Sequence, residues 1–250
     1  TEQELSARGD GAKEVVLYFE EGQQLSDLLL FIGYRAAGEV TVSVAAGTDW
    51  QIVQSGEELD SVFVWNEIPV SYRTNCLGLV FSDASVNLME LVCLDENGEP
   101  VLPVNAMQYP ALFDEQELYE DGITYQDQTI FDEIYHGRTA YEFLHGLPIY
   151  ENTHPPLGKT LISVGIAVFG MNPFGWRFMC VVFGSLMMPF IYLFGLRLTG
   201  KTRYACLAAV LLGTDFMHFT LSRIATIDII VAFFILGMFY FMYAFVVSEK

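Results

Sequence analysis

The stretch IIVAFFILGMFYFMYAFVV occupies residues 229–247 and contains no charged side chain. A helix of this length rises about 28 Å, which nearly matches the hydrocarbon core of a bilayer, roughly 30 Å thick. Uninterrupted apolar runs of this length are typical of membrane spans. The sequence therefore predicts a transmembrane helix over 227–247.

Two more apolar stretches precede this span. Residues 174–198 carry almost no charge, whereas residues 204–221 include Asp215 and His218. A buried helix of a soluble domain is the alternative interpretation of 204–221. We expect about three transmembrane helices, over 174–198, 204–221 and 227–247.

Basic residues orient these spans. Arg197, Lys201 and Arg203 crowd the short connection between the first two. Because short cytoplasmic loops are enriched in Lys and Arg, this connection is predicted to be cytoplasmic. Everything before residue 174, and the turn over 222–228, would then lie outside the cell.

Charge divides the chain into two environments. The chain has a net charge of −19, 52% hydrophobic residues and a mean hydropathy of +0.36. Residues 151–250 hold seven basic and four acidic side chains, so this part carries +3 and residues 1–150 carry the remaining −22. The acidic half excludes nucleic acid as a partner, since binding to phosphate backbones requires a basic surface.

Residues 1–108 are predicted to form an extracytoplasmic β-sandwich of the jelly-roll type. Short runs rich in β-branched and aromatic residues are separated by Gly, Asp, Asn or Ser, a pattern typical of all-β domains. The expected strands are 14–19, 28–34, 39–44, 61–65, 76–81 and 86–94. Trp50 and Trp65 are candidate sugar-stacking platforms, although core positions are the commoner use. Cys76 and Cys93 fall on expected strands, where a disulfide requires Cα atoms within about 7 Å.

Residues 109–173 are predicted to form an external catalytic loop with short helices. Asp132 and Glu133 are adjacent at an expected helix start, where their side chains point about 100° apart. One of them can face a reaction centre while the other anchors the loop. Acidic residues that only stabilise the helix N-terminus are the alternative.

His154, Pro155 and Pro156 begin a second informative stretch, which ends at Lys159. Two prolines fix the backbone and hold His154 and Lys159 in a defined relation to the membrane surface. Pro156 is suited to open a helix. Lys159 would bind a phosphate or headgroup, or else anchor the helix by snorkelling.

Arg177 and Arg223 each lie at the outer edge of an expected span, and Asp228 follows Arg223 by five positions. Charged residues at membrane depth are costly and mark candidate functional sites. Anchoring of the span ends is the alternative interpretation.

With these motifs in place, residues 131–243 resemble the protein O-mannosyltransferases of glycosyltransferase family 39, especially the bacterial members. The motifs that carry the resemblance are the Asp132-Glu133 pair, the His-Pro-Pro-Leu-Gly-Lys run over 154–159, and the turn with Ser222, Arg223 and Asp228. The resemblance implies a multi-spanning membrane fold of the GT-C type in the bacterial cell membrane. It also implies a polyprenyl-phosphate sugar donor, usually mannose, an acceptor hydroxyl of Ser or Thr, and inversion at the anomeric carbon.

By this resemblance, Asp132 takes the proton of the acceptor and Glu133 holds the loop through Arg177. Inverting transfer needs one base and positive groups for the leaving phosphate, and no second carboxylic acid. We expect no metal and no cofactor. The expected residues for binding of the donor phosphate and lipid are His154, Lys159, Arg177, Arg223 and Asp228.

The β-rich region upstream of Asp132 departs from the eukaryotic members of the family, which leaves a protein, a glycan or a lipid open as acceptor. We also expect the chain to be a fragment of a longer enzyme. A membrane-anchored carbohydrate-binding or envelope-interaction protein is one alternative. A metal-dependent hydrolase that uses His136, Glu142 and His145 is another, although their spacing matches no strong metal signature.

Overall fold

The computed structural model divides the chain into two compact units, Thr1–Gln128 and Thr129–Lys250. Each unit is described by itself. The two ends of the chain, Thr1 and Lys250, lie outside the described residues. The structure describes residues 6–7, 12–35, 38–47, 49–59, 61–82, 86–114, 116 and 123–248.

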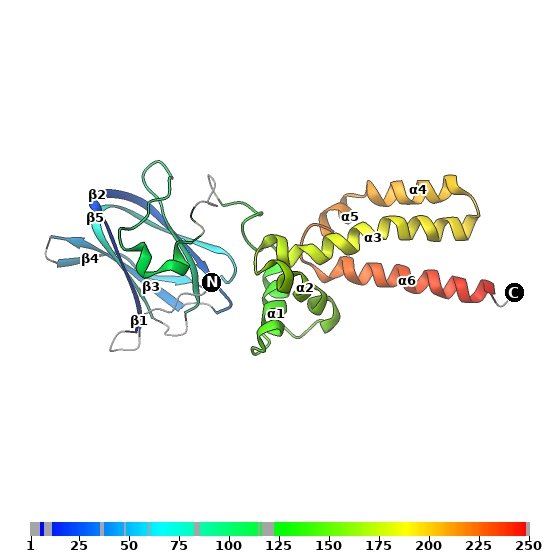
Figure 1. Ribbon diagram of the computed structural model, residues 1–250, viewed down its shortest axis with the longest axis horizontal. Coiled ribbons are helices and arrows are strands. Elements are labelled where there is room, and N and C mark those ends of the chain that lie inside the picture. Colours follow the sequence, from blue (N-terminus) through cyan, green and yellow to red (C-terminus); the bar gives the residue numbers. More distant parts are fainter. Residues whose placement is uncertain are drawn as a thin grey trace. The chain divides into compact units, whose positions relative to one another are not determined.

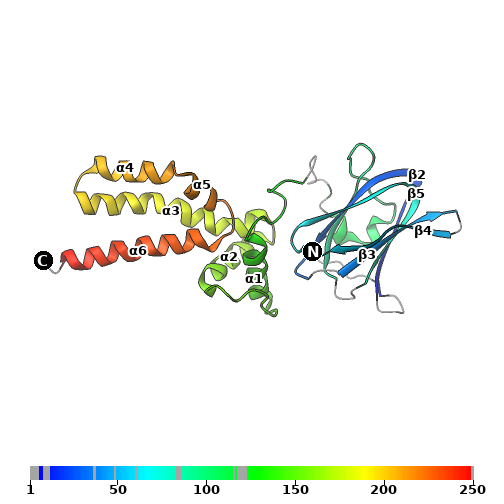
Figure 2. The same cartoon turned by 180° about the vertical axis from the view of Figure 1, so that it is seen from behind.

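The first unit is built on one antiparallel sheet, visible in Figures 1 and 2. Its strand order is β1-β2-β5-β3-β4, and β6 also pairs with β2. Two short 3-10 turns, Ala106–Gln108 and Pro110–Leu112, follow the sheet. The strands are β1 (Ser6–Ala7), β2 (Lys13–Ile32), β3 (Gly38–Ala46), β4 (Asp49–Leu59), β5 (Trp65–Phe81) and β6 (Leu88–Cys93).

The expected strands 14–19 and 28–34 are two parts of one 20-residue strand, β2. The polar segment between them stays in the sheet because the register shifts at a bulge between Tyr18 and Gln23. Gly22 lies in this bulge with φ of 72°, a conformation that glycine adopts without steric cost. The separation into two strands was therefore wrong, and β4 was not predicted.

Aromatic and sulfur side chains of this unit differ in their environments. Trp65 packs edge-on against Phe31, with ring centroids 5.2 Å apart, whereas Trp50 is 54% exposed and does not lie in the core. Cys76 and Cys93 are buried free thiols. Burial raises the pKa of Cys93 to about 12, so this thiol stays protonated and inert.

The second unit is helical. Local sequence signals set its boundaries: the side chain of Asn172 accepts a hydrogen bond from the Gly175 N–H (2.9 Å) at the start of α3, and Pro173 fills the first position. Gly146 ends α1 in the left-handed conformation. The helices are α1 (Glu133–His145), α2 (Pro156–Phe169), α3 (Pro173–Thr199), α4 (Thr202–Gly213), α5 (Phe216–Leu221) and α6 (Ile227–Ser248).

Helices α3 and α6 are long and apolar enough to cross a membrane. Their 27 and 22 residues rise about 40 and 33 Å. Most of their apolar side chains are not covered by the rest of the unit, as expected for surfaces that face lipid. Their length and uncovered apolar surfaces are those expected of helices in a membrane protein.

The stretch 204–221, expected as one span, forms α4 and α5. The break lies at Thr214 and Asp215, where the Asp215 carboxylate accepts a hydrogen bond from the His218 N–H (2.7 Å) and caps α5. A carboxylate that caps a new helix start interrupts the apolar run. The number of spans stays a prediction.

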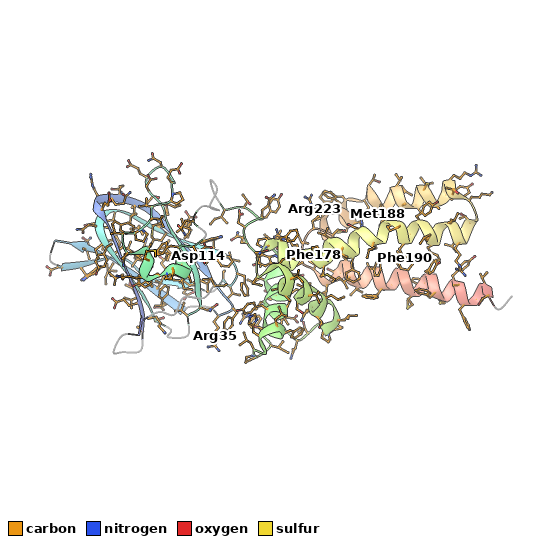
Figure 3. All side chains as sticks on the ribbon, viewed as in Figure 1. Arg35, Asp114, Phe178, Met188, Phe190 and Arg223 are labelled. Atoms are coloured by element: carbon orange, nitrogen blue, oxygen red, sulfur yellow. The ribbon has the colours of Figure 1, made fainter. Side chains whose placement is uncertain are left out.

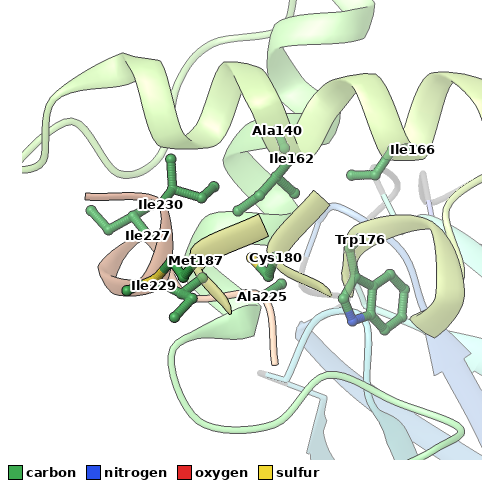
Figure 4. Packing of buried hydrophobic residues seen from close by; sticks show 10 residues of the cluster. All are labelled: Ala140, Ile162, Ile166, Trp176, Cys180, Met187, Ala225, Ile227, Ile229 and Ile230. Atoms are coloured by element: carbon green, nitrogen blue, oxygen red, sulfur yellow. The ribbon is translucent and has the colours of Figure 1, made fainter. Parts of the chain in front are cut away.

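A buried cluster joins α1, α2, α3 and α6, and Figure 4 shows ten of its side chains, among them Trp176, Ile162 and Ile227. Close backbone approach makes this packing possible. A Cβ added at Gly165 of α2 would lie 2.4 Å from the carbonyl oxygen of Gly175 in α3. Phe190, labelled in Figure 3, extends the contact of α3 with α6 through the rings of Phe233 and Tyr240.

Candidate functional site

Glu133 is the centre of the site. It is the first residue of α1 and its side chain is fully buried. Oε1 accepts hydrogen bonds from Nε of Arg177 and the Ala225 N–H, both at 2.7 Å. Oε2 accepts from Nη2 of Arg177 at 2.7 Å and from the Ile130 N–H at 2.9 Å. One carboxylate thus ties the start of α1 to α3 and to the loop before α6.

Asp132 has a different environment from its neighbour. It takes the N-cap position of α1, is half-buried, and makes no capping hydrogen bond with its side chain in the described helix. Phe131, directly before it, has φ of 51°. This left-handed conformation is uncommon for a bulky residue and marks a locally constrained turn. Asp132 therefore lies at the helix N-terminus, where an acidic residue interacts favourably with the helix dipole, but its side chain makes no capping hydrogen bond.

Lys159 is buried in α2, with 1% of its surface exposed. Its Nζ donates to the backbone oxygen of Glu151 at 2.8 Å and also pairs with the Glu151 carboxylate. Burial alone would raise the pKa of Glu151, but hydrogen bonds from Lys159 and Thr153 outweigh it and lower the pKa to about 2. Lys159 thus holds the loop before α2 instead of lying free at the membrane surface.

Gly158, in the run over 154–159, has a packing role. A Cβ at Gly158 would lie 2.7 Å from Cγ2 of Ile227, the first residue of α6. The His-Pro-Pro-Leu-Gly-Lys run therefore packs tightly against the start of α6, which a larger residue at 158 would prevent.

The ring of His136 in α1 lies against the ring of His154 in the loop before α2, with centroids 5.4 Å apart and ring planes at 83°. His154 is half exposed, and its Nδ1 lies 3.3 Å from Oε1 of Glu151. Burial lowers the pKa of His136, and the positive charges of Lys159 and His154 lower it further, against the opposite effect of Asp132 and Glu151. His136 is therefore neutral at pH 7.

The hydrolase triad suggested by the sequence does not assemble among the described residues. Glu142 accepts from Nε of Arg138 at 2.9 Å and from the Tyr150 N–H at 2.8 Å. His145 turns away to the Tyr141 backbone oxygen, 3.0 Å from its Nδ1. Glu142 and His145 are structural residues of α1.

The expected cations differ in exposure. Arg177 is 12% exposed and bound to Glu133, while Arg223 is exposed and lies over the ring of Phe219, with 4.7 Å between Cζ and the centroid. Figure 3 labels Arg223, which lies in the connection from α5 to α6. Asp228 is exposed in the first turn of α6.

Two parts of the site were not predicted. The Ala225 N–H left no trace in the sequence, because a backbone donor is independent of side-chain identity. Glu151 is the second: it precedes the 154–159 motif, and its pairing with Lys159 depends on the fold of the loop before α2.

Part of the helical unit is similar in sequence to known proteins. Residues 153–250 match the sequence profile of a family described as dolichyl-phosphate-mannose-protein mannosyltransferase. The profile match includes the 154–159 run, Arg177, Arg223 and Asp228, and begins after the Asp132-Glu133 pair.

Curated relatives agree with the profile. A polyprenol-phosphate-mannose–protein mannosyltransferase of Mycobacterium tuberculosis is 34% identical over 116 residues, 44% of this chain and 22% of that protein. Its counterpart in Corynebacterium glutamicum is 40% identical over 82 residues, 33% of this chain and 16% of that protein. The protein O-mannosyl-transferase 2 of Danio rerio is 30% identical over 131 residues, 46% of this chain and 17% of that protein.

The chain thus spans about a fifth of the length of the curated relatives it matches. The similarity falls on the helical unit, which holds the buried Glu133–Arg177 pair and the loop before α2. Residues 153–250 of the helical unit are therefore similar in sequence to the protein O-mannosyltransferases of glycosyltransferase family 39.

Proposed function

We propose that this protein transfers a sugar, mannose by analogy with its relatives, from a polyprenyl-phosphate donor to a Ser or Thr hydroxyl of a protein, with inversion. The observation that carries the proposal is the contrast between two adjacent carboxylates. Glu133 is buried with four hydrogen bonds, whereas Asp132 is half-buried without a capping bond. The pair divides into an anchor and a group available for chemistry.

Asp132 is the general base. A hydroxyl attacks an anomeric carbon faster when a positioned carboxylate takes its proton in the transition state. Because the phosphate of the donor is a good leaving group, no second carboxylic acid has to protonate it. Glu133 is a positioning residue, since its contacts with Arg177 and Ala225 fix the turn that presents Asp132.

The leaving phosphate requires positive charge at the membrane edge. Arg223 is the exposed candidate among the expected cations, and Phe219 beneath it supports the guanidinium plane. Lys159 and Arg177, also expected to bind the phosphate, are paired with Glu151 and Glu133, which offset their charge, so Arg223 supplies most of the positive charge in this proposal. His154 and Asp228 border the same site in this proposal.

The proposal includes the orientation of the helical unit in the membrane and the fold of the first unit. The Arg197–Arg203 connection lies at the opposite end of the helical unit from α1 and α2, as both ribbon views agree (Figures 1 and 2). By the positive-inside rule, α1, the loop before α2 and the first unit lie on the outer side of the membrane. In this proposal about three transmembrane helices cross the membrane, and the strands of the first unit, which pair in one continuous sheet, fold over as the expected β-sandwich.

The experiment uses the protein expressed with its whole open reading frame and purified in detergent. It is incubated with labelled polyprenyl-phosphate-mannose and a Ser/Thr-rich peptide, and the anomeric configuration of the product is determined by NMR. We expect glycopeptide whose anomer is opposite to that of the donor. Retention of configuration, or hydrolysis of the donor without transfer, would contradict the proposal.

A further inference from the structure

Three potential metal ligands come together at the loop before α2. His136 projects from α1, and Glu151 and His154 lie in the segment that leads to Pro156. One ligand atom of each residue lies within 4.8 Å of the ligand atoms of the other two. These residues come from two parts of the chain, so the grouping is produced by the fold.

The buried histidine supplies an independent observation. His136 is 4% exposed, and its Nδ1 has no hydrogen-bond partner among the described residues. Buried polar atoms without a partner are rare, because loss of water costs about 1–3 kcal/mol when nothing replaces it. An imidazole beside a carboxylate and a second imidazole is an environment in which a metal ion can satisfy a ring nitrogen that has no other partner.

We propose that His136, Glu151 and His154 bind one divalent transition-metal ion, with Zn²⁺ as the ion that this ligand set fits. Two imidazoles and one carboxylate form the three-ligand set of open zinc sites, in which the fourth position takes water or a substrate atom. Ca²⁺ and Mg²⁺ fit poorly, because they prefer sites made mostly of oxygen ligands.

The geometry is close to what such an ion requires. Zinc–ligand bonds of about 2.0–2.1 Å place neighbouring tetrahedral ligands about 3.4 Å apart. Nδ1 of His154 and Oε1 of Glu151 already lie 3.3 Å apart. The remaining separations, up to 4.8 Å, close by rotation of the half-exposed His154 ring and a small shift of the loop.

Other contacts of Glu151 are compatible with metal binding. Lys159 pairs with Oε2 and with the backbone oxygen, which fixes the carboxylate and leaves Oε1 facing His154. The Thr153 side chain and N–H also bond to Oε1, and the ion would take the place of this hydroxyl. An ion pair between protonated His154 and Glu151 is the competing explanation, but it leaves Nδ1 of His136 without a partner.

The test measures metal content instead of activity, so its outcome is independent of the proposed transfer. The protein with its whole open reading frame is purified on a tag without histidine, stripped with chelator, loaded with Zn²⁺, desalted and analysed by mass spectrometry. We expect about one zinc per chain. Visible absorption of the Co²⁺-loaded protein reports whether the ion is four-coordinate.

Variants identify the ligands. His154→Ala removes a half-exposed side chain and should leave folding intact, which its melting temperature checks. Loss of a residue that only hydrogen-bonds to a metal ligand weakens metal binding about 10–100-fold. Loss of the ligand His154 itself should therefore weaken zinc binding by at least about 100-fold. His136→Ala should give the same loss, whereas the control His145→Ala, on the same helix, should keep the zinc.

Three results would contradict the proposed zinc site. Failure of the loaded protein to retain zinc would refute it, as would unchanged zinc affinity in folded His154→Ala. Loss of zinc in His145→Ala equal to that in His136→Ala would place any ion elsewhere. Asp132→Asn, which disables the proposed transfer, should keep its zinc.

Discussion

Glu133→Gln tests the anchor of the site, because it keeps the shape of the side chain and removes its charge. The amide has one oxygen, so it can replace only one of the two carboxylate oxygens. The amide nitrogen would then face two donors, either Nε of Arg177 with the Ala225 N–H, or Nη2 of Arg177 with the Ile130 N–H. Two of the four hydrogen bonds are lost in either orientation.

The magnitude follows from these contacts. Two hydrogen bonds to a charged group contribute about 1.5–3 kcal/mol each, so the loss is about 3–6 kcal/mol. Breaking one partner of a buried ion pair costs about 3–5 kcal/mol, in agreement. Since 1 kcal/mol shifts the melting temperature of a chain of this size by about 2–4 °C, Glu133→Gln should lower it by roughly 10 °C.

The assay is thermal unfolding of the purified protein in detergent, with yield from membranes as a second readout. Asp132→Asn is the matched control, because its side chain makes no capping bond and its loss should change stability by less than about 0.5 kcal/mol. Equal melting temperatures for Glu133→Gln and the wild type would refute the claim that this carboxylate holds α1, α3 and the loop before α6 together.

Three further predictions address topology, donor binding and packing. A cysteine introduced at Lys201 should be inaccessible to a membrane-impermeant thiol reagent in intact cells, and labelling from outside would reverse the topology. Arg223→Gln should raise the KM for the lipid donor with little effect on the KM for the acceptor, while Arg203→Gln at the other end of the helices should change neither; equal donor KM in both variants would make Arg223 a membrane anchor. Gly165→Ala should lower stability by about 1–3 kcal/mol, since its methyl group would meet the Gly175 carbonyl, and an unchanged melting temperature would contradict this packing.

The long apolar runs were the part of the sequence from which structure was predicted best. The stretches 174–198 and 227–247 predicted α3 and α6 closely, because a long apolar run with few charges is a strong signal for a helix of this length. The sheet was harder. Polar residues between the two halves of β2 suggested a turn, yet a bulge at Gly22 lets the strand continue.

Within the site, the sequence singled out candidate residues but gave few of their contacts. Asp132 and Glu133 stood out as a pair, and the Glu133–Arg177 contact anticipated from the family resemblance is present. Burial of Lys159 against Glu151 was not anticipated, because a lysine near an expected span more often reaches toward the interface. The meeting of His136 with His154 depends on how α1 packs on the loop before α2, which no local pattern encodes.

The most direct test of the account is the turnover of Asp132→Asn. Asparagine preserves the size and hydrogen-bonding capacity of the side chain but cannot accept the acceptor proton. Positioned general-base catalysis contributes about 10²–10⁴-fold, so kcat for mannose transfer should fall by about that factor at matched expression, with unchanged donor KM and melting temperature. Near-normal turnover by Asp132→Asn would contradict the assignment of Asp132 as the base, and with it the mechanism.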